Sequence, residues 1–167
     1  MLAERVALLA ERPGVTALQR RLMPQGRGII DLLVVGPAGI TVVDGLLLDR
    51  PPRIARMSGG FAEPRGERLL AGARDHTGAV RAVEREVAAV SRALSGPGHA
   101  HELPAVRGAL CLPDGLSLIA FAELRLHDVL IDGPQTVAFT ASRPGTLTAP
   151  QVERLAERLA RAFPPAS

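Results

Sequence analysis

The fold is decided by residues 28–48, which read Gly28-Ile-Ile-Asp-Leu-Leu-Val-Val-Gly-Pro-Ala-Gly-Ile-Thr-Val-Val-Asp-Gly-Leu-Leu-Leu48. Two runs of β-branched residues and leucine flank a Gly-Pro-Ala-Gly turn, and each run contains one aspartate. Short apolar runs separated by turn residues are typical of a buried β-hairpin. The stretch is long enough to span a membrane, but two aspartates and a central Gly-Pro pair make that interpretation costly. We therefore predict a central β-hairpin over residues 28–48.

The two aspartates of this hairpin are the strongest candidates for functional residues. If the glycines that flank Pro-Ala close the turn, Asp31 lies directly opposite Asp44, with Cβ atoms about 4.5–5.5 Å apart. Two carboxylates at about 5 Å repel by roughly 3 kcal/mol at an effective dielectric constant of about 20. The pair therefore needs a bound divalent cation, a shared proton or an arginine between the carboxylates. The alternative is that one aspartate lies at a strand end or pairs with Arg27 or Arg53.

Composition limits the class of protein. The chain of 167 residues is long enough for one domain with a sizeable core, and we treat residues 1–167 as a single domain. Tryptophan and tyrosine are absent and only four phenylalanines occur, so aliphatic side chains and alanine must form the core. All 20 basic residues are arginine and the net charge is +3, which is weak evidence for a nucleic-acid partner.

Cysteine usage and the first residues predict a cytoplasmic protein. Cys111 is the single cysteine, so no internal disulfide can form, which fits a reducing compartment. Glu4 and Arg5 stand where a signal peptide would need an apolar run. We expect no contact with a membrane.

The rest of the chain alternates helices and strands. The apolar spacing predicts helices over residues 2–12, 77–94 and 135–142 and a last helix after Thr148, with strands over residues 15–23, 105–112 and 124–131 and a small polar hairpin over residues 53–63. Thr77 is expected to cap the longest helix, and Thr148 and Gln151 have the spacing of a capping box. This order predicts an α/β or α+β fold in which helices flank a mixed β-sheet.

The central hairpin also resembles a known family. The pattern Gly28-x-Ile30-Asp31-x-Leu33-Val34-Val35-Gly36-Pro37-x-Gly39-Ile40-x-Val42-Val43-Asp44 is similar to the central signature of the nuclease-related domain (NERD) family. Weaker likeness lies at Glu4-Arg5, in the strand over residues 105–112, and in the ending Pro144-Gly145-x-Leu147 with Pro164-Pro165. That family is grouped with the restriction-endonuclease-like fold, whose active site is a PD-(D/E)xK arrangement. The resemblance implies such a mixed sheet and metal-dependent hydrolysis of DNA phosphodiesters.

The resemblance assigns roles to three acidic residues. Asp31 and Asp44 match the acids that are taken as metal ligands, and Glu4 matches the glutamate of the opening helix. The implied catalytic set is therefore Asp31, Asp44 and Glu4, with Mg²⁺ held by the two aspartates. In such a site the ion activates water and stabilises charge on the phosphate.

Three positions depart from the family pattern. Ile29, Leu32 and Leu46 stand where asparagine, histidine and lysine are usual. The lysine would orient the attacking water and stabilise charge on the phosphate, and leucine can do neither. Arginine could supply the charge but could not act as a base, and the candidates are Arg50, Arg53 and Arg81. We therefore expect weak cation binding and weak or absent hydrolysis.

The alternative is a non-catalytic module that keeps the nuclease-like fold. It would bind DNA, another protein or a second copy of the chain through the arginines near the hairpin, which are Arg20, Arg21, Arg27, Arg50, Arg53 and Arg56. If these do not share a face, they form an ordinary solvated surface. A nuclease should show both aspartates facing one open cleft with an arginine nearby, whereas a binding module should show that cleft filled by Leu32 or Leu46. His99-x-His101 lacks partner ligands and is a weak zinc signal.

Overall fold

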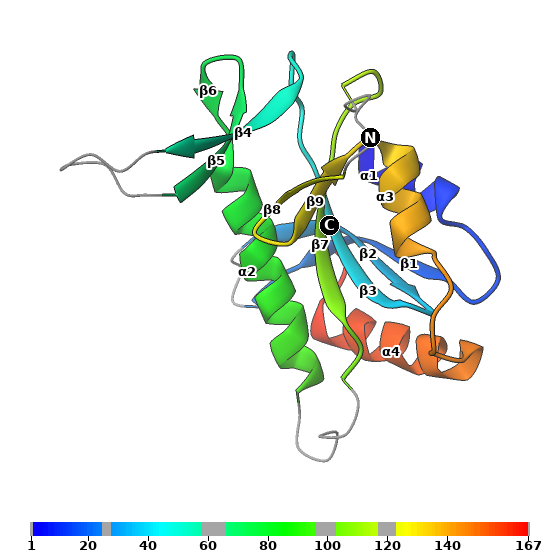
Figure 1. Cartoon of the computed structure of the whole chain (residues 1–167). Coiled ribbons are helices and arrows are strands. Elements are labelled where there is room, and N and C mark those ends of the chain that lie inside the picture. The colour runs from blue at the N-terminus through cyan, green and yellow to red at the C-terminus, as the bar shows by residue number, and fades with distance from the viewer. Residues whose placement is uncertain (1, 25–27, 58–65, 96–102, 117–122, 167) are drawn as a thin grey trace.

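A computed structural model describes residues 2–24, 28–57, 66–95, 103–116 and 123–166. The helices are α1 (Leu2–Leu9), α2 (Thr77–Leu94), α3 (Pro134–Ala141) and α4 (Ala149–Ala162). The strands are β1 (Thr16–Leu22), β2 (Ile29–Gly36), β3 (Gly39–Gly45), β4 (Pro52–Met57), β5 (Gly66–Ala71), β6 (Arg74–Asp75), β7 (Val106–Cys111), β8 (Leu124–Leu126) and β9 (Val129–Asp132). The predicted mixed α/β fold is confirmed, with helices on both faces of a mixed sheet (Figure 1).

The main sheet has six strands in the order β1-β2-β3-β7-β9-β8. Strands β1, β2 and β3 pair antiparallel, β3, β7 and β9 run parallel, and β8 returns antiparallel to β9. The predicted hairpin is therefore real, and β2 and β3 lie inside the sheet. Both strands are paired on both sides and buried on both faces, which is why they read as continuous apolar runs.

Two helical layers cover the sheet. Helices α1 and α3 pack on one face, where Val6 and Val137 join Leu32, Val34 and Val43 in one cluster. Helices α2 and α4 cover the other face, where the buried side chains of β1, β2 and β3 meet α4 and those of β7 and β9 meet α2. Each fully buried leucine or valine of these clusters contributes roughly 1.5–3 kcal/mol relative to an exposed one. The core is aliphatic, as the composition predicts.

One glycine sets the position of α2 on the sheet. A Cβ atom added to Gly108 of β7 would lie 2.5 Å from Cγ1 of Val83, so only glycine lets the helix approach this closely. Val83 belongs to the buried stripe of α2, and the residues one turn later are held over the same part of the sheet. This close approach brings α2 next to the end of β3.

A small second sheet extends from one end of α2. Strands β4, β5 and β6 pair antiparallel, and this sheet projects away from the main sheet (Figure 1, left). Ile54 and Leu69 anchor it to the cluster under α2. The predicted polar hairpin began correctly near Arg53, but β4 pairs with residues 66–71, beyond the predicted partner strand. That predicted partner, residues 61–63, lies outside the described residues.

The predicted strand over residues 124–131 is two strands. Leu126 pairs with Val129, so His127 and Asp128 alone form the turn between β8 and β9. Their φ angles are +50° and +66°, as a tight hairpin turn requires. This turn lacks the glycine that is usual at such a position, so the sequence pattern predicted one continuous strand.

The four predicted helices are present, although α1 ends at Leu9, three residues before its predicted end. Helix α2 spans the predicted residues 77–94, and α4 begins with the predicted capping box of Thr148 and Gln151. The predicted cap at Thr77 is wrong, because Thr77 is the first helical residue and its hydroxyl accepts the backbone N–H of Leu69. The Asp75 carboxylate accepts the N–H of Thr77 instead. Across the described ranges, no helix has both the length and the apolar content to cross a membrane.

Candidate carboxylate site

The hairpin register brings the two aspartates close together. Gly36 pairs with Gly39, and the ladder continues to Leu32 and Val43. The pairing ends there, one position short of Asp31 and Asp44, so the predicted cross-strand pair is not part of the observed ladder. The two aspartates are nevertheless neighbours, because the backbone N–H of Asp31 donates to the Asp44 carboxylate.

Each aspartate accepts a backbone hydrogen bond from the other strand. The backbone N–H of Asp31 donates to Oδ1 of Asp44 at 3.3 Å, and the N–H of Gly45 donates to Oδ2 of Asp31 at 3.0 Å. Hydrogen bonds of this kind favour the ionised carboxylate. The sequence suggested a cation, a proton or an arginine as compensation, and the structure adds the backbone amides.

Glu86 of α2 is a third acid at this site. Its side chain is only 6% exposed, and it shares a hydrogen bond with the Asp44 carboxyl group. Its Oε2 atom is buried, and no group in the described part of the chain hydrogen-bonds to it. We call Asp31, Asp44 and Glu86 the carboxylate cluster.

Sequence analysis missed Glu86, although a signal was present. Glu86 stands three residues after Val83 and four before Val90, both of which are fully buried. On a helix, that spacing places a side chain on the same face as the apolar stripe. An acid inside the buried stripe of an otherwise regular amphipathic helix is therefore a candidate functional residue.

The cluster holds protons at neutral pH. Burial, together with the nearby charge of Asp31, raises the pKa of Asp44 to about 6, although hydrogen bonds from the Asp31 backbone and Glu86 oppose the rise. Burial, and then the charge and hydrogen bond of Asp44, raise the pKa of Glu86 to about 9. At pH 7 the Asp44–Glu86 pair therefore carries one proton, and titration belongs to the pair more than to either acid.

No described arginine neutralises the carboxylate cluster by an ion pair. Arg85 is the arginine whose charge acts on Glu86, and it opposes the rise in pKa. Of the arginines suggested as substitutes for the lysine, Arg50 packs beside Gly72 and Arg53 lies on β4 of the small sheet. Arg81 acts on Asp75. Arg27, the other suggested partner, lies outside the described residues.

A groove of about 700 Å³ runs along α2 beside Glu86. Arg85 and Arg92 line it from the helix, and Met23 and Pro24 line it from the end of β1. The groove thus combines a buried carboxyl group with two arginines. Asp31 and Asp44 do not line this groove, so it is not the open cleft faced by both aspartates that the nuclease interpretation requires.

The remaining predicted positions lie in different surroundings. Glu4 is exposed on α1, and it is not among the groups that shift the pKa values of Asp44 and Glu86. Leu32 is fully buried under α1 and α3, whereas Leu46 packs partly buried beside the cluster under α2. Ile29 is 41% exposed. Leu46 is thus the apolar replacement that lies nearest the α2 side of the sheet.

Metal coordination needs several ligand atoms around one point. No group of three or more His, Cys, Asp or Glu residues among the described side chains is arranged to hold a metal ion. The chemistry of the donor set nevertheless fits a hard cation, because it consists of carboxylate oxygens, one of which lacks a partner. His99 and His101, the weak zinc candidates, lie outside the described residues.

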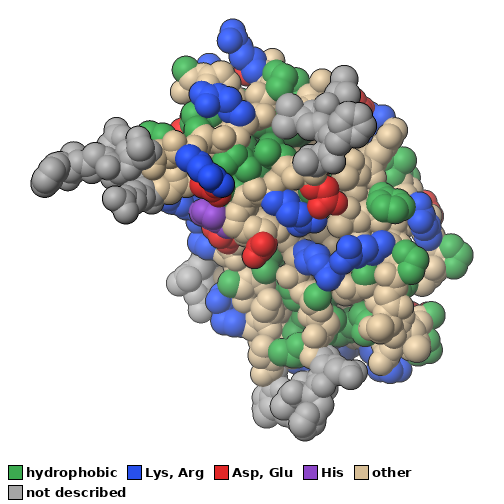
Figure 2. Space-filling view, in the orientation of Figure 1, with side chains coloured by type: hydrophobic (Ala, Val, Ile, Leu, Met, Phe, Trp, Pro, Cys, Tyr) green, Lys and Arg blue, Asp and Glu red, His purple; other side chains and the backbone are tan. Residues whose placement is uncertain are grey.

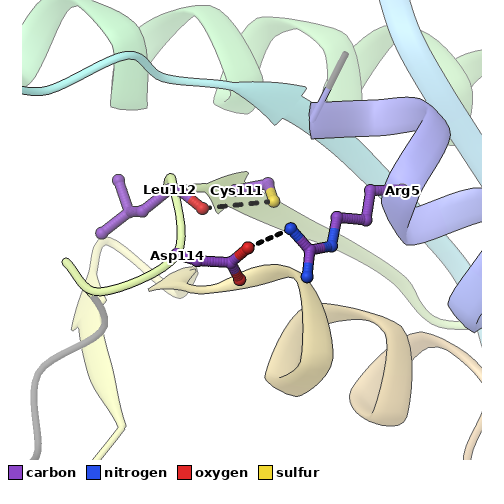
Figure 3. Close-up of polar contacts among 4 residues, drawn as sticks. All are labelled: Arg5, Cys111, Leu112 and Asp114. Carbon is purple, nitrogen blue, oxygen red and sulfur yellow. Dashed lines mark hydrogen bonds and ion pairs between the residues drawn. The ribbon is translucent and has the colours of Figure 1, made fainter.

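The cysteine lies near a separate ion pair. Arg5 of α1 and Asp114 form a salt bridge close to Cys111 at the end of β7 (Figure 3). Burial, followed by the charge of Asp114, raises the pKa of Cys111 to about 12. A buried thiol with such a pKa is an inert core residue.

Comparisons with protein-family models, with curated proteins and with solved structures find no match to this chain.

Proposed function

We propose that this chain is a nuclease-like domain that binds a divalent cation weakly and has weak or absent hydrolytic activity toward DNA. Asp31 and Asp44 would hold the ion, for which Mg²⁺ is the leading candidate. The observation that carries the proposal is the contact of Asp31 with Asp44 and of Asp44 with Glu86, which lines a groove together with two arginines. The resemblance of residues 28–44 to the NERD signature supports it independently.

A bound cation would stabilise the carboxylate cluster. Asp44 lies between the charge of Asp31 and the carboxyl group of Glu86, and an ion with oxygen ligands would replace the shared proton and relieve the repulsion. Glu86 would add its unpaired Oε2 once it loses its proton. When bound, the ion would supply a polarised water and charge stabilisation for a phosphate. Arg85 and Arg92 would orient the phosphate backbone in the groove.

Leu46 explains the weak activity that we propose. It packs partly buried beside Leu48 and Ile54, where it offers no hydrogen bond to a water molecule or phosphate. Glu86 retains its proton at neutral pH, so it does not act as a base there. The carboxylate cluster is therefore better suited to binding a cation than to activating a water molecule.

The test is cleavage of plasmid and single-stranded DNA with Mg²⁺ or Mn²⁺. We expect little or no nicking by the wild type and a gain by Leu46→Lys, since a lysine there can extend toward the groove from its partly buried stem. Leu46→Met is the matched control, because it keeps an apolar side chain of similar volume.

Two results would decide against this proposal. Strong wild-type nicking that is lost in Asp31→Asn/Asp44→Asn would show an active nuclease. The acids are not a cation site if wild type and Leu46→Lys both fail to nick DNA and a cation raises the melting temperature of neither.

The alternative function is a non-catalytic binding module. The proton shared by Asp44 and Glu86 favours it, because a cation must displace that proton before it can bind. Titration with Mn²⁺ at pH 6 and pH 8 separates the two functions. A cation site should bind more tightly at pH 8 and release protons, whereas a module without a cation site should show no heat at either pH.

A further inference from the structure

A group of arginines lies on the sheet face opposite to Asp44 and Glu86. Arg125 of β8 pairs with Leu130 of β9, which pairs with Ala109 of β7, so all three share one face. Arg107 precedes Ala109 by two residues on β7 and faces the same way. This is the face that α1 and α3 cover, because Ala109 and Leu130 belong to their cluster.

Arg143 follows α3 and meets the same region. Nη1 of Arg107 donates to the carbonyl oxygen of Ala38 at 2.9 Å, in the turn between β2 and β3. The chain just after Arg143 packs on that turn as well, because Gly145 contacts the backbone of Pro37 and Ala38. The three residues Arg107, Arg125 and Arg143 are called the arginine cluster below.

The positive charge of this cluster is poorly balanced. Burial, and then the charges of Arg143 and Arg125, lower the pKa of Arg107. Arg125 forms an ion pair with Glu123 at 2.8 Å, but within the described ranges neither Arg107 nor Arg143 has a carboxylate partner. Figure 2 shows basic side chains close to one another near the centre of the face that it presents, with acidic side chains next to them. Guanidinium groups do not lose a proton, so their charge is compensated by solvent or by a bound anion.

We propose that Arg107, Arg125 and Arg143 bind phosphate groups of a nucleic-acid backbone, at a surface separate from the carboxylate cluster. Guanidinium groups bind phosphate through paired hydrogen bonds, and the bond to Ala38 fixes Arg107 in advance. Arg107 is half-buried, so a protruding strand of phosphates reaches it more easily than a flat membrane surface does. The choice of nucleic acid rests on the proposed function, whereas phosphate recognition does not.

The test uses a fluorescently labelled DNA duplex in buffer with EDTA, so that no cation bridges DNA to the acids. Arg125→Gln/Arg143→Gln removes two charges and leaves the bond between Arg107 and Ala38 in place. Arg154→Gln/Arg161→Gln is the matched control, because it removes two charges from exposed positions of α4 on the other side of the sheet. Anisotropy is measured over a range of salt concentrations.

We expect the cluster variant to bind more weakly and its plot of log K against log salt to become less steep by about 2, while the control keeps the wild-type slope. Equal losses in both variants, no loss in either, or no DNA binding by the wild type would overturn the proposal. Loss of binding to phosphatidylserine vesicles with unchanged DNA binding would assign the arginine cluster to membranes and would also overturn it.

The outcome can be separated from that of the proposed function. Asp31→Asn/Asp44→Asn should keep the EDTA-resistant binding to DNA. If the arginine cluster variant loses this binding while no cation binding is found, the arginine cluster stands and the cation site fails. If instead a cation binds and the arginine variant has no effect on DNA binding, the proposed function stands and the phosphate-binding proposal fails.

Discussion

Side chains of like charge lie together on both faces of the main sheet, and their repulsion is relieved in different ways on the two faces. On the α2 face, Asp44 and Glu86 are buried together, and raised pKa values let the pair hold a proton. On the α1 and α3 face, Arg107 has two arginine neighbours, yet all remain charged at any ordinary pH. Acids can relieve crowding by protonation, whereas arginines need a ligand or solvent.

This difference has a consequence for ligand binding. A cation that enters the carboxylate cluster competes with a proton, so its affinity depends on pH. An anion that enters the arginine cluster competes only with salt and water. The two faces should therefore respond to different solution conditions, and the predictions below use this to separate them.

The largest effect is expected from Glu86→Gln. The folded pKa of Glu86 lies at about 9, above the ordinary value of 4.5, so the folded protein binds more protons between these values. Wild-type stability therefore falls as pH rises from about 4.5 to 9. Glutamine imitates the neutral acid and should remove the part of this fall that is due to Glu86, so that the variant unfolds at higher denaturant concentration than wild type at pH 9. Urea unfolding at pH 5 and pH 9 measures it.

The control for this experiment is Glu153→Gln, which changes an exposed glutamate on α4. It should leave the pH dependence as in wild type. If Glu86→Gln also unfolds with the wild-type pH dependence, the Asp44–Glu86 pair does not share a proton.

A second prediction concerns the approach of α2 to the sheet. Gly108→Ala places a methyl group 2.5 Å from Val83 Cγ1 and should destabilise the fold by about 1–3 kcal/mol. It should also disturb Glu86 and so flatten the pH dependence, without altering the arginine face. Gly78→Ala on the same helix meets no atom within 4 Å and should be neutral or stabilising by up to about 1 kcal/mol. Thermal unfolding of both variants distinguishes crowding from helix propensity.

The pair Arg5–Asp114 provides a reference with opposite charges. Both side chains are about half exposed, at 54% and 49%. Arg5→Ala should cost only about 0.2–1 kcal/mol, and salt should reduce the difference from wild type. A loss well above this range in thermal unfolding at high salt would mean that the Arg5 stem is important for packing near Cys111.

The smallest effect on stability is expected from Arg143→Gln. Arg143 is exposed, so the change should stay within about 0.5 kcal/mol, with no dependence on pH between 5 and 9. A stability change that grows with pH would mean that the two faces are coupled, contrary to the comparison above. Urea unfolding across this pH range decides the question.

The sequence predicted the hairpin and the nearness of Asp31 to Asp44 because both depend on local rules of turn closure and alternation. It did not predict Glu86 as a partner of Asp44, because α2 reaches the end of β3 only through the close approach at Gly108. The arginine cluster was also not predicted, since Arg107, Arg125 and Arg143 come together through strand order. The turn at His127 escaped notice because neither of its residues is glycine.

The segment after α4 closes one side of the molecule. The N–H of Leu22 donates to Pro164, the N–H of Ala166 donates to Arg20, and Arg21 bridges to Pro165, so this short segment pairs with the outer edge of β1. An open strand edge is a template for pairing with another chain, and proline there cannot extend the ladder further. Residues 164–166 therefore cover the edge strand, which reduces its tendency to pair with another chain, and they offer no regular edge of their own.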